Sequence, residues 1–248
     1  MRVLGLDSST STGGVALLDG DRLVAEYTLD VRRTTHSERL MPAVKRVMDD
    51  AGLDPQSGVD GIAVATGPGS FTGLRIAVVT AKSLSYAWRT PLAGISTLEA
   101  MAFQAAGPFP LVCPLIDARY GNVYAAAYEP AGEELRPRLA PGLRPIDEVL
   151  DWLEQATAGP GTEGPVMFVG DGVPVHWDAL ASRLGDRARR PPAGFLQLRA
   201  AAVAALGARR LAAGRQDDPA RLVPSYLRKS EAERKWEAGN RSRSSSSP

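Results

Sequence analysis

The chain has 248 residues, of which 44% are hydrophobic, and 29 Lys and Arg against 28 Asp and Glu leave a net charge of +1. A chain of this length buries about 70% of its unfolded surface, so one large domain or two lobes can be stable without disulfides or metals. The near-neutral charge argues against a protein that grips nucleic acid strongly by itself.

The single cysteine, Cys113, lies in an apolar run, so no internal disulfide can form and a reducing compartment is expected. The start of the chain lacks the apolar core of a signal peptide, and no apolar run approaches the roughly 20 residues that span a bilayer. We therefore expect a cytoplasmic protein without membrane contact.

The first third of the chain predicts a mixed α/β unit. A short apolar run ends in Asp7, and two further runs separated by turn residues predict an antiparallel meander. Residues 37–51 have apolar side chains at helical spacing, with Ser37 as N-cap. The continuous apolar run of residues 61–66 predicts a parallel strand, and the glycine-rich GPGSFTGLR leads from it into a helix over 72–88.

A second unit begins with the apolar strand LVCPLID, which ends in Asp117 and continues through the turn ARYGN into another strand. Further helices and a buried strand follow, and from about Gln216 the chain becomes polar. We expect an N-terminal lobe over 1–105, a C-terminal lobe over 106–215, and a tail over 216–248 that is partly disordered.

One arrangement therefore occurs twice: a strand ends in Asp, a short turn follows, and a second strand begins. Each copy leads into about 100 residues of mixed α/β sequence. This layout resembles that of the actin, sugar-kinase and Hsp70 ATPase superfamily. The predicted fold class is α/β, with two ribonuclease-H-like lobes in an actin-like ATPase fold. In that superfamily the two Asp-bearing hairpins face the phosphates of ATP.

The first hairpin carries an acid and several hydroxyl donors, beside two glycines that allow a tight bend. Its candidate nucleotide-binding residues are Asp7, Ser8, Ser9 and Thr10. In the second hairpin, Arg119 and Tyr120 are expected to block a close approach of phosphate to the backbone, so the fold is predicted to be degenerate. The competing interpretation, that Asp7 and Asp117 simply end their strands, stays open because Asp is common at turns.

The GPGSFTGLR loop lies between a strand and a helix, where phosphate loops often occur. It lacks the Gly-Lys-Ser/Thr ending of a Walker A loop, and it matches the dinucleotide fingerprint poorly because Thr72 stands at the third glycine position. Its glycines could equally permit a tight turn and close packing. The helix over 72–88 is apolar around most of its circumference, which favours contact with a partner over purely internal packing.

Metal and nucleophile patterns are absent from the sequence. The two histidines, His36 and His176, are not paired at helical spacing, and neither a Cys/His cluster nor a Gly-x-Ser-x-Gly elbow occurs. We therefore expect no metal site, no catalytic residue and no enzymatic activity of the chain alone. His36, just before a helix, is interpreted as a surface or interface residue.

Several segments together resemble the bacterial TsaB family, also called YeaZ. They cover residues 3–228 in the family's order: LGLDSSTSTGGVAL, THSERLMPAV, GIAVATGPGSFTGLRIAVVTAKSLSYAW, GISTLEAMA, PLIDARYGNVYAAAYE and PSYLR. The resemblance implies a degenerate actin-like subunit that supports TsaD, the catalytic subunit that adds threonylcarbamoyl to an adenosine beside the tRNA anticodon.

The resemblance also implies a heterodimer with TsaD, a larger assembly with the ATPase TsaE, a homodimer when the chain is alone, and only indirect contact with tRNA. No cofactor is expected, except for ATP or ADP at a shared interface. The partner surface would lie on the helices over 37–51 and 72–88, with candidate residues His36, Leu40, Met41, Val44, Phe71, Thr72, Leu74, Arg75, Ala77, Val78 and Ala81.

Leu74→Asp and Ala77→Arg are accordingly expected to disrupt partner association. Two alternatives remain from other functional classes. One is an actin-like ATPase or kinase that uses Asp7 and the GPGS loop. The other is an independent tRNA-binding module, which the near-neutral charge disfavours.

Overall fold

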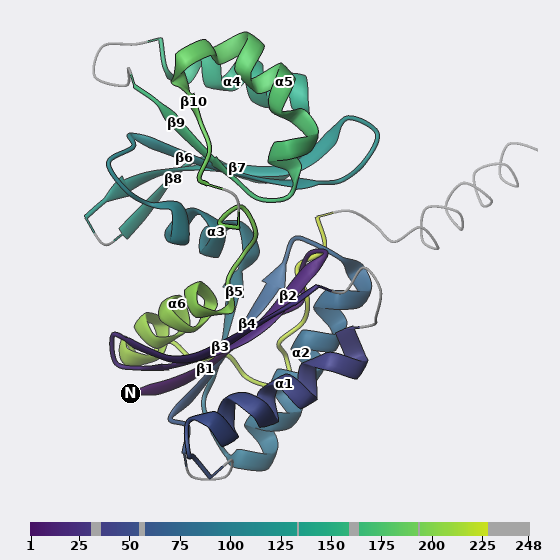
Figure 1. Ribbon diagram of the computed structural model, residues 1–248, viewed down its shortest axis with the longest axis vertical. Helices are drawn as coiled ribbons and strands as arrows, with labels where there is room; N and C mark the ends of the chain where they lie inside the picture. Colours follow the sequence, from purple (N-terminus) through teal and green to yellow (C-terminus); the bar gives the residue numbers. More distant parts are fainter. Residues whose placement is uncertain (31–35, 55–57, 133, 159–163, 193, 228–248) are drawn as a thin grey trace, which may run out of the picture.

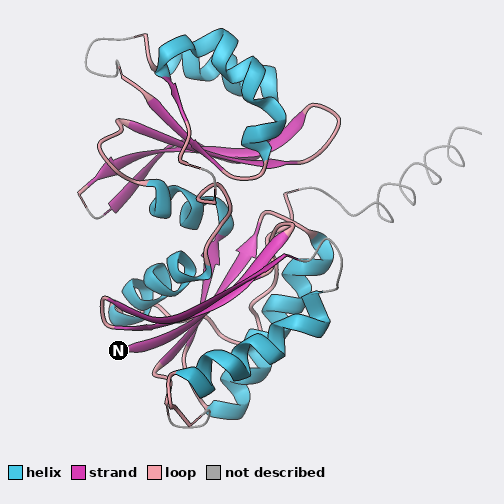
Figure 2. Ribbon diagram, viewed as in Figure 1, coloured by secondary structure: helices cyan, strands magenta, loops and turns pink. Residues whose placement is uncertain are grey.

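The computed structural model describes residues 1–30, 36–54, 58–132, 134–158, 164–192 and 194–227, and the side chains of residues 29 and 36–38 lie outside this description. Two lobes, each built on one five-stranded sheet, are stacked along the long axis of the molecule (Figure 1). Helices cover the sheets, and the lobes meet through packed helices (Figure 2).

The N-terminal sheet has the strand order β3-β2-β1-β4-β5. Its strands are β1 (Arg2–Asp7), β2 (Thr12–Asp19), β3 (Arg22–Asp30), β4 (Gly61–Gly67) and β5 (Leu92–Ser96). The predicted meander is confirmed, since β1 pairs antiparallel with β2 and β2 with β3, whereas β1, β4 and β5 run parallel. The carboxyl ends of the parallel strands place Asp7 and Gly67 at the same edge of the sheet.

The C-terminal sheet repeats this topology, with the order β10-β9-β6-β7-β8. Its strands are β6 (Leu111–Asp117), β7 (Asn122–Ala131), β8 (Glu134–Pro145), β9 (Val166–Val169) and β10 (Ala188–Arg189). Pairing is again antiparallel from β6 to β8 and parallel from β6 to β10. Because each strand of one sheet has a counterpart at the same place in the other, the predicted duplication is confirmed.

Helices follow the same repeat. They are α1 (His36–Asp50), α2 (Phe71–Trp88), α3 (Thr97–Ala105), α4 (Ile146–Ala156), α5 (Gly172–Leu184) and α6 (Ala200–Ala212), with a short 3-10 turn at Gly185–Arg187. In the N-terminal lobe, α1 and α2 cover one face of the sheet and α6 covers the other (Figure 1). The apolar face of α1 and most of α2 is thereby buried in one core with β1, β2 and β4.

The third helix of each unit packs against the sheet of the other unit. Helix α3 contacts β6 to β9, and α6 contacts β1 to β5. Close contact of α6 with the N-terminal sheet depends on glycine: a Cβ at Gly5 would lie 2.5 Å from the carbonyl oxygen of Ala200, and one at Gly207 would lie 2.2 Å from Ala63 Cβ. The predicted lobe 106–215 was therefore wrong at its end, because α6 lies on the N-terminal lobe.

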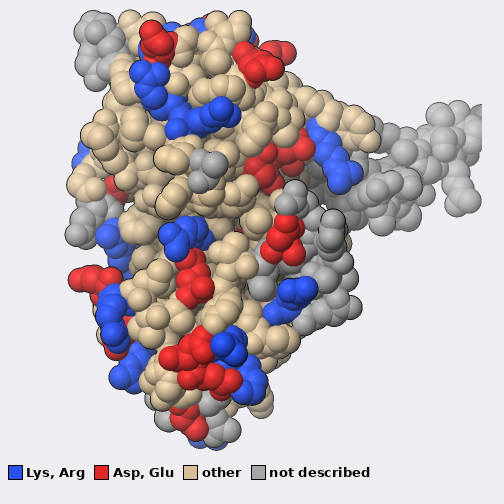
Figure 3. Space-filling view, viewed as in Figure 1, with Lys and Arg blue, Asp and Glu red and all other residues tan. Residues whose placement is uncertain are grey.

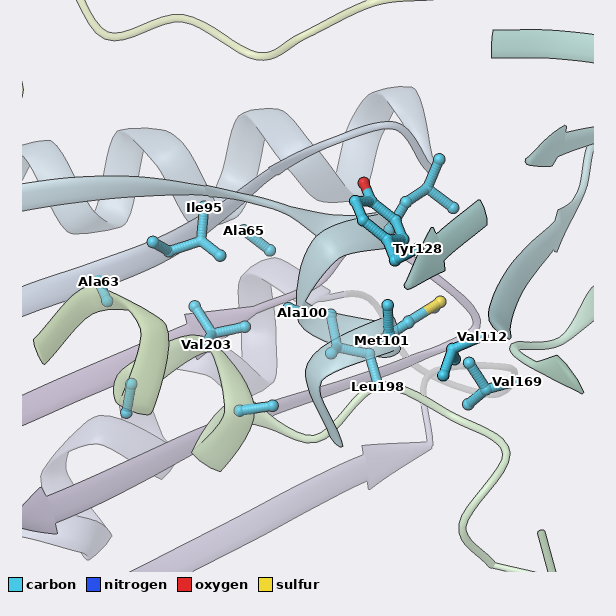
Figure 4. Packing of buried hydrophobic residues seen from close by; sticks show 14 of the residues in the cluster. Ala63, Ala65, Ile95, Ala100, Met101, Val112, Tyr128, Val169, Leu198 and Val203 are labelled. Carbon is cyan, nitrogen blue, oxygen red and sulfur yellow. The ribbon is translucent and has the colours of Figure 1, made fainter. Parts of the chain in front are cut away.

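A single hydrophobic cluster joins the two lobes. It includes Ala63 and Ile95 of the first sheet, Val112 and Val169 of the second, and Met101 of α3 between them (Figure 4). All five side chains are at most 3% exposed. Separating the lobes would expose this apolar surface to water, at a free-energy cost of about 25 cal/mol per Å², so the shared core holds the lobes together.

Strand β8 has no counterpart in the sequence predictions. Prolines at 137, 141 and 145 and a mostly exposed set of side chains hide the alternating pattern of a strand. The sheet accommodates these prolines because β8 is its edge strand, where a missing N–H can face solvent.

The two helices predicted over residues 37–51 and 72–88 are confirmed as α1 and α2, and their predicted ends lie within one residue of the observed ones.

Candidate functional site

The first candidate site, the β1–β2 hairpin, is closed by the start of α2. Asp7, Ser8 and Ser9 have no exposed surface, and Thr10 is 5% exposed. The Ser8 hydroxyl donates to the carbonyl oxygen of Gly73 over 2.6 Å, and Ser70 N donates to the carbonyl oxygen of Ser9 over 2.6 Å. In this conformation Asp7, Ser8 and Ser9 have no accessible surface for a phosphate to contact, so the structure gives no support to the predicted nucleotide site.

Glycines make this close contact between backbones possible. A Cβ at Gly69 would lie 2.2 Å from the carbonyl oxygen of Ser9, and one at Gly73 would lie 1.9 Å from that of Ser8. Real Cβ atoms stay beyond 3.0 Å, so any side chain at these positions would force the hairpin away from α2. Of the two interpretations of the GPGSFTG loop, close packing is therefore the one that fits the structure.

The carboxyl group of Asp7 is electrostatically unusual. Burial raises its pKa from 3.8 to about 6, and hydrogen bonding from Ser9 opposes the rise. Ser9 N donates to Asp7 Oδ1 over 2.9 Å, whereas Oδ2 has no hydrogen-bond partner among the described residues. An acid held in this way destabilises the fold when it ionises.

The turn of the β6–β7 hairpin is exposed, unlike that of the β1–β2 hairpin. Arg119 and Tyr120 take the left-handed conformation, with φ of 64° and 55°, and they point outward, Tyr120 being 90% exposed. The side-chain amide of Asn122 stabilises the turn, because it donates to the carbonyl oxygens of Arg119 and Tyr120. The prediction that these two side chains block a close approach of phosphate to the backbone stays a prediction.

Asp117 lies at the base of this second hairpin, beside Asp171 and His176. Its backbone N–H donates to Asp171 Oδ1 over 3.1 Å, and its Oδ1 lies 3.9 Å from His176 Nε2. Burial, together with the neighbouring Asp117 charge, raises the pKa of Asp171. Across the described residues, no three His, Cys, Asp or Glu side chains are grouped so as to hold a metal ion.

The second candidate site, the outer surface of α1 and α2, is only partly made of the predicted residues. Six of them are at most 2% exposed and pack in the core beneath the helices: Leu40, Val44, Leu74, Ala77, Val78 and Ala81. Their assignment as contact residues was wrong for this conformation, because the helical apolar pattern marks the side that faces the sheet. Leu74→Asp and Ala77→Arg would therefore place a charge in the protein's own core.

Four predicted interface residues do reach the surface: Met41, Phe71, Thr72 and Arg75. The side chain of His36 lies outside the described residues. Two large hydrophobic residues exposed on α2 were missed, Val79 at 61% and Tyr86 at 86% exposure. We define the α2 outer stripe as Thr72, Arg75, Val79, Ser83 and Tyr86. Their spacing of three or four residues was the signal that could have identified the stripe.

The α2 outer stripe has no acidic residue near it on its own helix. Helix α2 contains Arg75 and Lys82 and no Asp or Glu. The stripe exposes a large aliphatic side chain, Val79, and a large aromatic one, Tyr86, on a helix with two cations, which is typical of an interaction surface.

Over the described part of the chain, no helix is both long and apolar enough to cross a membrane.

Several known proteins are similar to this chain over most of its length. Residues 30–236 match the family model described as TsaD, tRNA N6-adenosine threonylcarbamoyltransferase. The tRNA threonylcarbamoyladenosine biosynthesis protein TsaB of Bacillus subtilis is 36% identical over 95% of this chain and 98% of its own length.

Solved structures of similar fold agree with the sequence matches. YeaZ from Pseudomonas aeruginosa has a TM-score of 0.71 at 28% identity, covering 91% of this chain and 99% of its own. Component A of the (R)-2-hydroxyglutaryl-CoA dehydratase of Acidaminococcus fermentans has a TM-score of 0.52 at 12% identity over 86% of this chain and 99% of its own, which shows a shared fold alone. The chain has the duplicated, actin-like α/β fold and belongs to the TsaB (YeaZ) family.

Proposed function

We propose that the chain is a non-catalytic partner and scaffold of a TsaD-type transferase in the formation of threonylcarbamoyladenosine beside the tRNA anticodon. The observation that carries this proposal is the contrast between its two candidate sites. The β1–β2 hairpin is enclosed by the glycine loop and α2, whereas the α2 outer stripe is exposed and carries Val79 and Tyr86 beside the cation of Arg75. A protein of this kind can act by binding a partner protein through the α2 outer stripe.

The proposed assembly is a heterodimer with the TsaD-type subunit, joined by a TsaE-type ATPase, with tRNA contacted only indirectly. The match of residues 30–236 to the TsaD family supports pairing between two chains of related fold. A homodimer would form when the partner is missing. ATP or ADP is expected only at an interface shared with a partner, and the cytoplasm is the expected site of this work.

Reconstitution tests the proposal. The chain, the TsaD-type subunit and the TsaE-type ATPase of the same genome are purified, and threonylcarbamoyl transfer to tRNA is measured with and without each. We expect transfer to require the TsaD-type subunit and to fall at least tenfold when the chain is omitted. Robust transfer by the chain alone, or full transfer without it, would refute the scaffold role.

Val79→Asp is expected to weaken association with the TsaD-type subunit by at least tenfold while the protein stays folded. Val79 is 61% exposed on α2, so the change leaves the core intact but places a charge in the proposed interface. Val175→Asp is the matched control, because Val175 is a helical valine of equal exposure on α5. Size-exclusion profiles and titrations measure both; equal behaviour of the two variants would show that the assigned face is wrong.

An actin-like ATP-binding enzyme that uses Asp7 remains the second candidate, because the buried Oδ2 of Asp7 lacks a partner among the described residues. Calorimetry with ATP and magnesium tests it. Micromolar binding that Asp7→Ala abolishes would favour this function. We expect none, because the hairpin would first have to leave α2.

An independent tRNA-binding module is the third candidate. On the face shown in Figure 3, acidic and basic side chains are interspersed without a large area of one sign. Strong phosphate binding needs many uncompensated cations. Filter binding of tRNA at physiological salt decides the matter, and submicromolar affinity of the chain alone would favour the module.

A further inference from the structure

The segment 216–227, which we call the C-terminal strap, runs over the N-terminal sheet and along α2. Asp217 N donates to the carbonyl oxygen of Leu92 over 2.8 Å, and Asp217 Oδ2 accepts from Gly94 N over 2.8 Å. Ser225 N donates to the carbonyl oxygen of Thr66 over 2.7 Å. The strap is therefore fastened to both β5 and β4.

Two glycines of the sheet make room for the strap. A Cβ at Gly67 would lie 2.7 Å from the carbonyl oxygen of Ser225, and one at Gly94 would lie 2.8 Å from Leu222 Cδ1. From α2, Lys82 Nζ donates to the carbonyl oxygen of Leu222 over 3.1 Å. Sheet and helix are thus both shaped to hold the strap, so it is an integral part of the lobe.

The end of the strap carries Tyr226 to the first turn of α2. Its ring centroid lies 4.8 Å from that of Phe71, and its hydroxyl accepts from Arg75 Nε over 2.9 Å. The Arg75 guanidinium lies 3.8 Å from the centroid of the Phe71 ring. We call these three residues the 71/75/226 cluster. Phe71 is 36% and Tyr226 41% exposed, so the side chains that contact one another are also accessible to a partner.

Arg75 has no acidic partner in the part of the chain that the structure describes: its hydrogen bond there goes to Tyr226, and its stacking contacts go to rings. Stacked, exposed arginine with tyrosine is the composition of binding hot spots. A carboxylate of a partner protein would supply the ionic contact that Arg75 lacks among the described residues. A second copy of this chain fits less well, because a two-fold contact through this patch brings the same cation face to face.

We propose that the 71/75/226 cluster is a recognition site for a carboxylate-bearing, apolar face of the TsaD-type subunit, with Tyr226 of the PSYLR segment as a contact and positioning residue for Arg75. The proposal rests on the function proposed above. The strap links the end of the second repeat to the partner surface of the first, and Tyr226 fixes the guanidinium in the orientation in which the partner's carboxylate meets it.

The test is a titration of full-length protein with the purified TsaD-type subunit of the same genome at low and high salt. Tyr226→Ala is expected to weaken binding about tenfold, and Tyr226→Phe, which keeps the ring but loses the hydrogen bond, by about threefold. Arg75→Met, which keeps apolar contact with Phe71, should flatten the salt dependence of binding. Tyr120→Ala removes a tyrosine of the other lobe that is 90% exposed and lies outside the cluster, so it is the control and should bind as wild type.

Outcomes separate this inference from the proposed function. If the wild-type chain binds and Tyr226→Ala binds equally well, the inference is overturned and the scaffold role stands. If Tyr226→Ala loses binding only together with its thermal stability, and Arg75→Met keeps the full salt dependence, the cluster is structural and the inference is again overturned. If the wild-type chain neither binds nor supports transfer, the proposed function itself fails.

Discussion

Gly73→Ala is expected to lower the free energy of unfolding by about 4 kcal/mol. In an ordinary helix the same change stabilises by about 1 kcal/mol, because alanine loses less backbone entropy. Here the new Cβ would lie 1.9 Å from the carbonyl oxygen of Ser8. The hairpin backbone would have to move, at up to about 3 kcal/mol for overpacking, and its two hydrogen bonds to α2 would lose about 1 kcal/mol each.

Urea denaturation measures this change. Ser83→Ala, at an exposed position of the same helix, is the control and should alter stability by less than about 0.5 kcal/mol. If Gly73→Ala proves as stable as the wild-type protein, the hairpin is not held against α2. The enclosure of Asp7, on which the non-catalytic role depends, would then be lost.

Asp7→Asn is expected to stabilise the protein at pH 8 by up to about 3 kcal/mol. The pKa of the carboxyl group rises from 3.8 to about 6 on folding, a difference of about two units at about 1.4 kcal/mol each. The folded state holds its proton more tightly than the unfolded state does. Stability from this group is therefore complete below about pH 4 and is lost as the pH rises through 6. Asparagine removes the charge and can still accept the hydrogen bond from Ser9 N.

Denaturation at pH 4 and pH 8 tests the sign. The difference between Asp7→Asn and wild type should be close to zero at pH 4 and largest at pH 8. Asp21→Asn, at an exposed turn position, should change stability by less than about 0.5 kcal/mol at either pH. A loss of stability at pH 8 for Asp7→Asn would mean that a bound cation stabilises the carboxylate, which would favour the ATP-binding candidate.

Much of the fold was predictable because the signals are local. The twofold recurrence of a strand ending in Asp identified the duplication, and apolar periodicity located α1 and α2. The placement of α6 was not predictable in this way. Its apolar pattern shows that it packs but not against which sheet, and the information lies in Gly5 and Gly207, far apart in the sequence.

The candidate site was predicted less well, for the same reason. An apolar helix face can point to the protein's own core or to a partner, and periodicity alone cannot distinguish them; Leu74 and Val79 lie on opposite sides of α2. Whether glycines serve a phosphate or another backbone depends on what they approach, and Gly73 approaches Ser8. Tyr226 meets Phe71 across 155 residues of sequence, a pairing that only the folded chain displays.

The position of α6 also has a consequence for synthesis on the ribosome. The first sheet emerges early, but the helix that covers one of its faces and the strap that crosses its end are made only after the whole second lobe. Until then, an apolar sheet face stays open to chaperones and to misassociation. Because Tyr226 completes the 71/75/226 cluster, a nascent or truncated chain would lack part of the proposed recognition surface. Partner binding would thus select for polypeptides whose translation has passed residue 226.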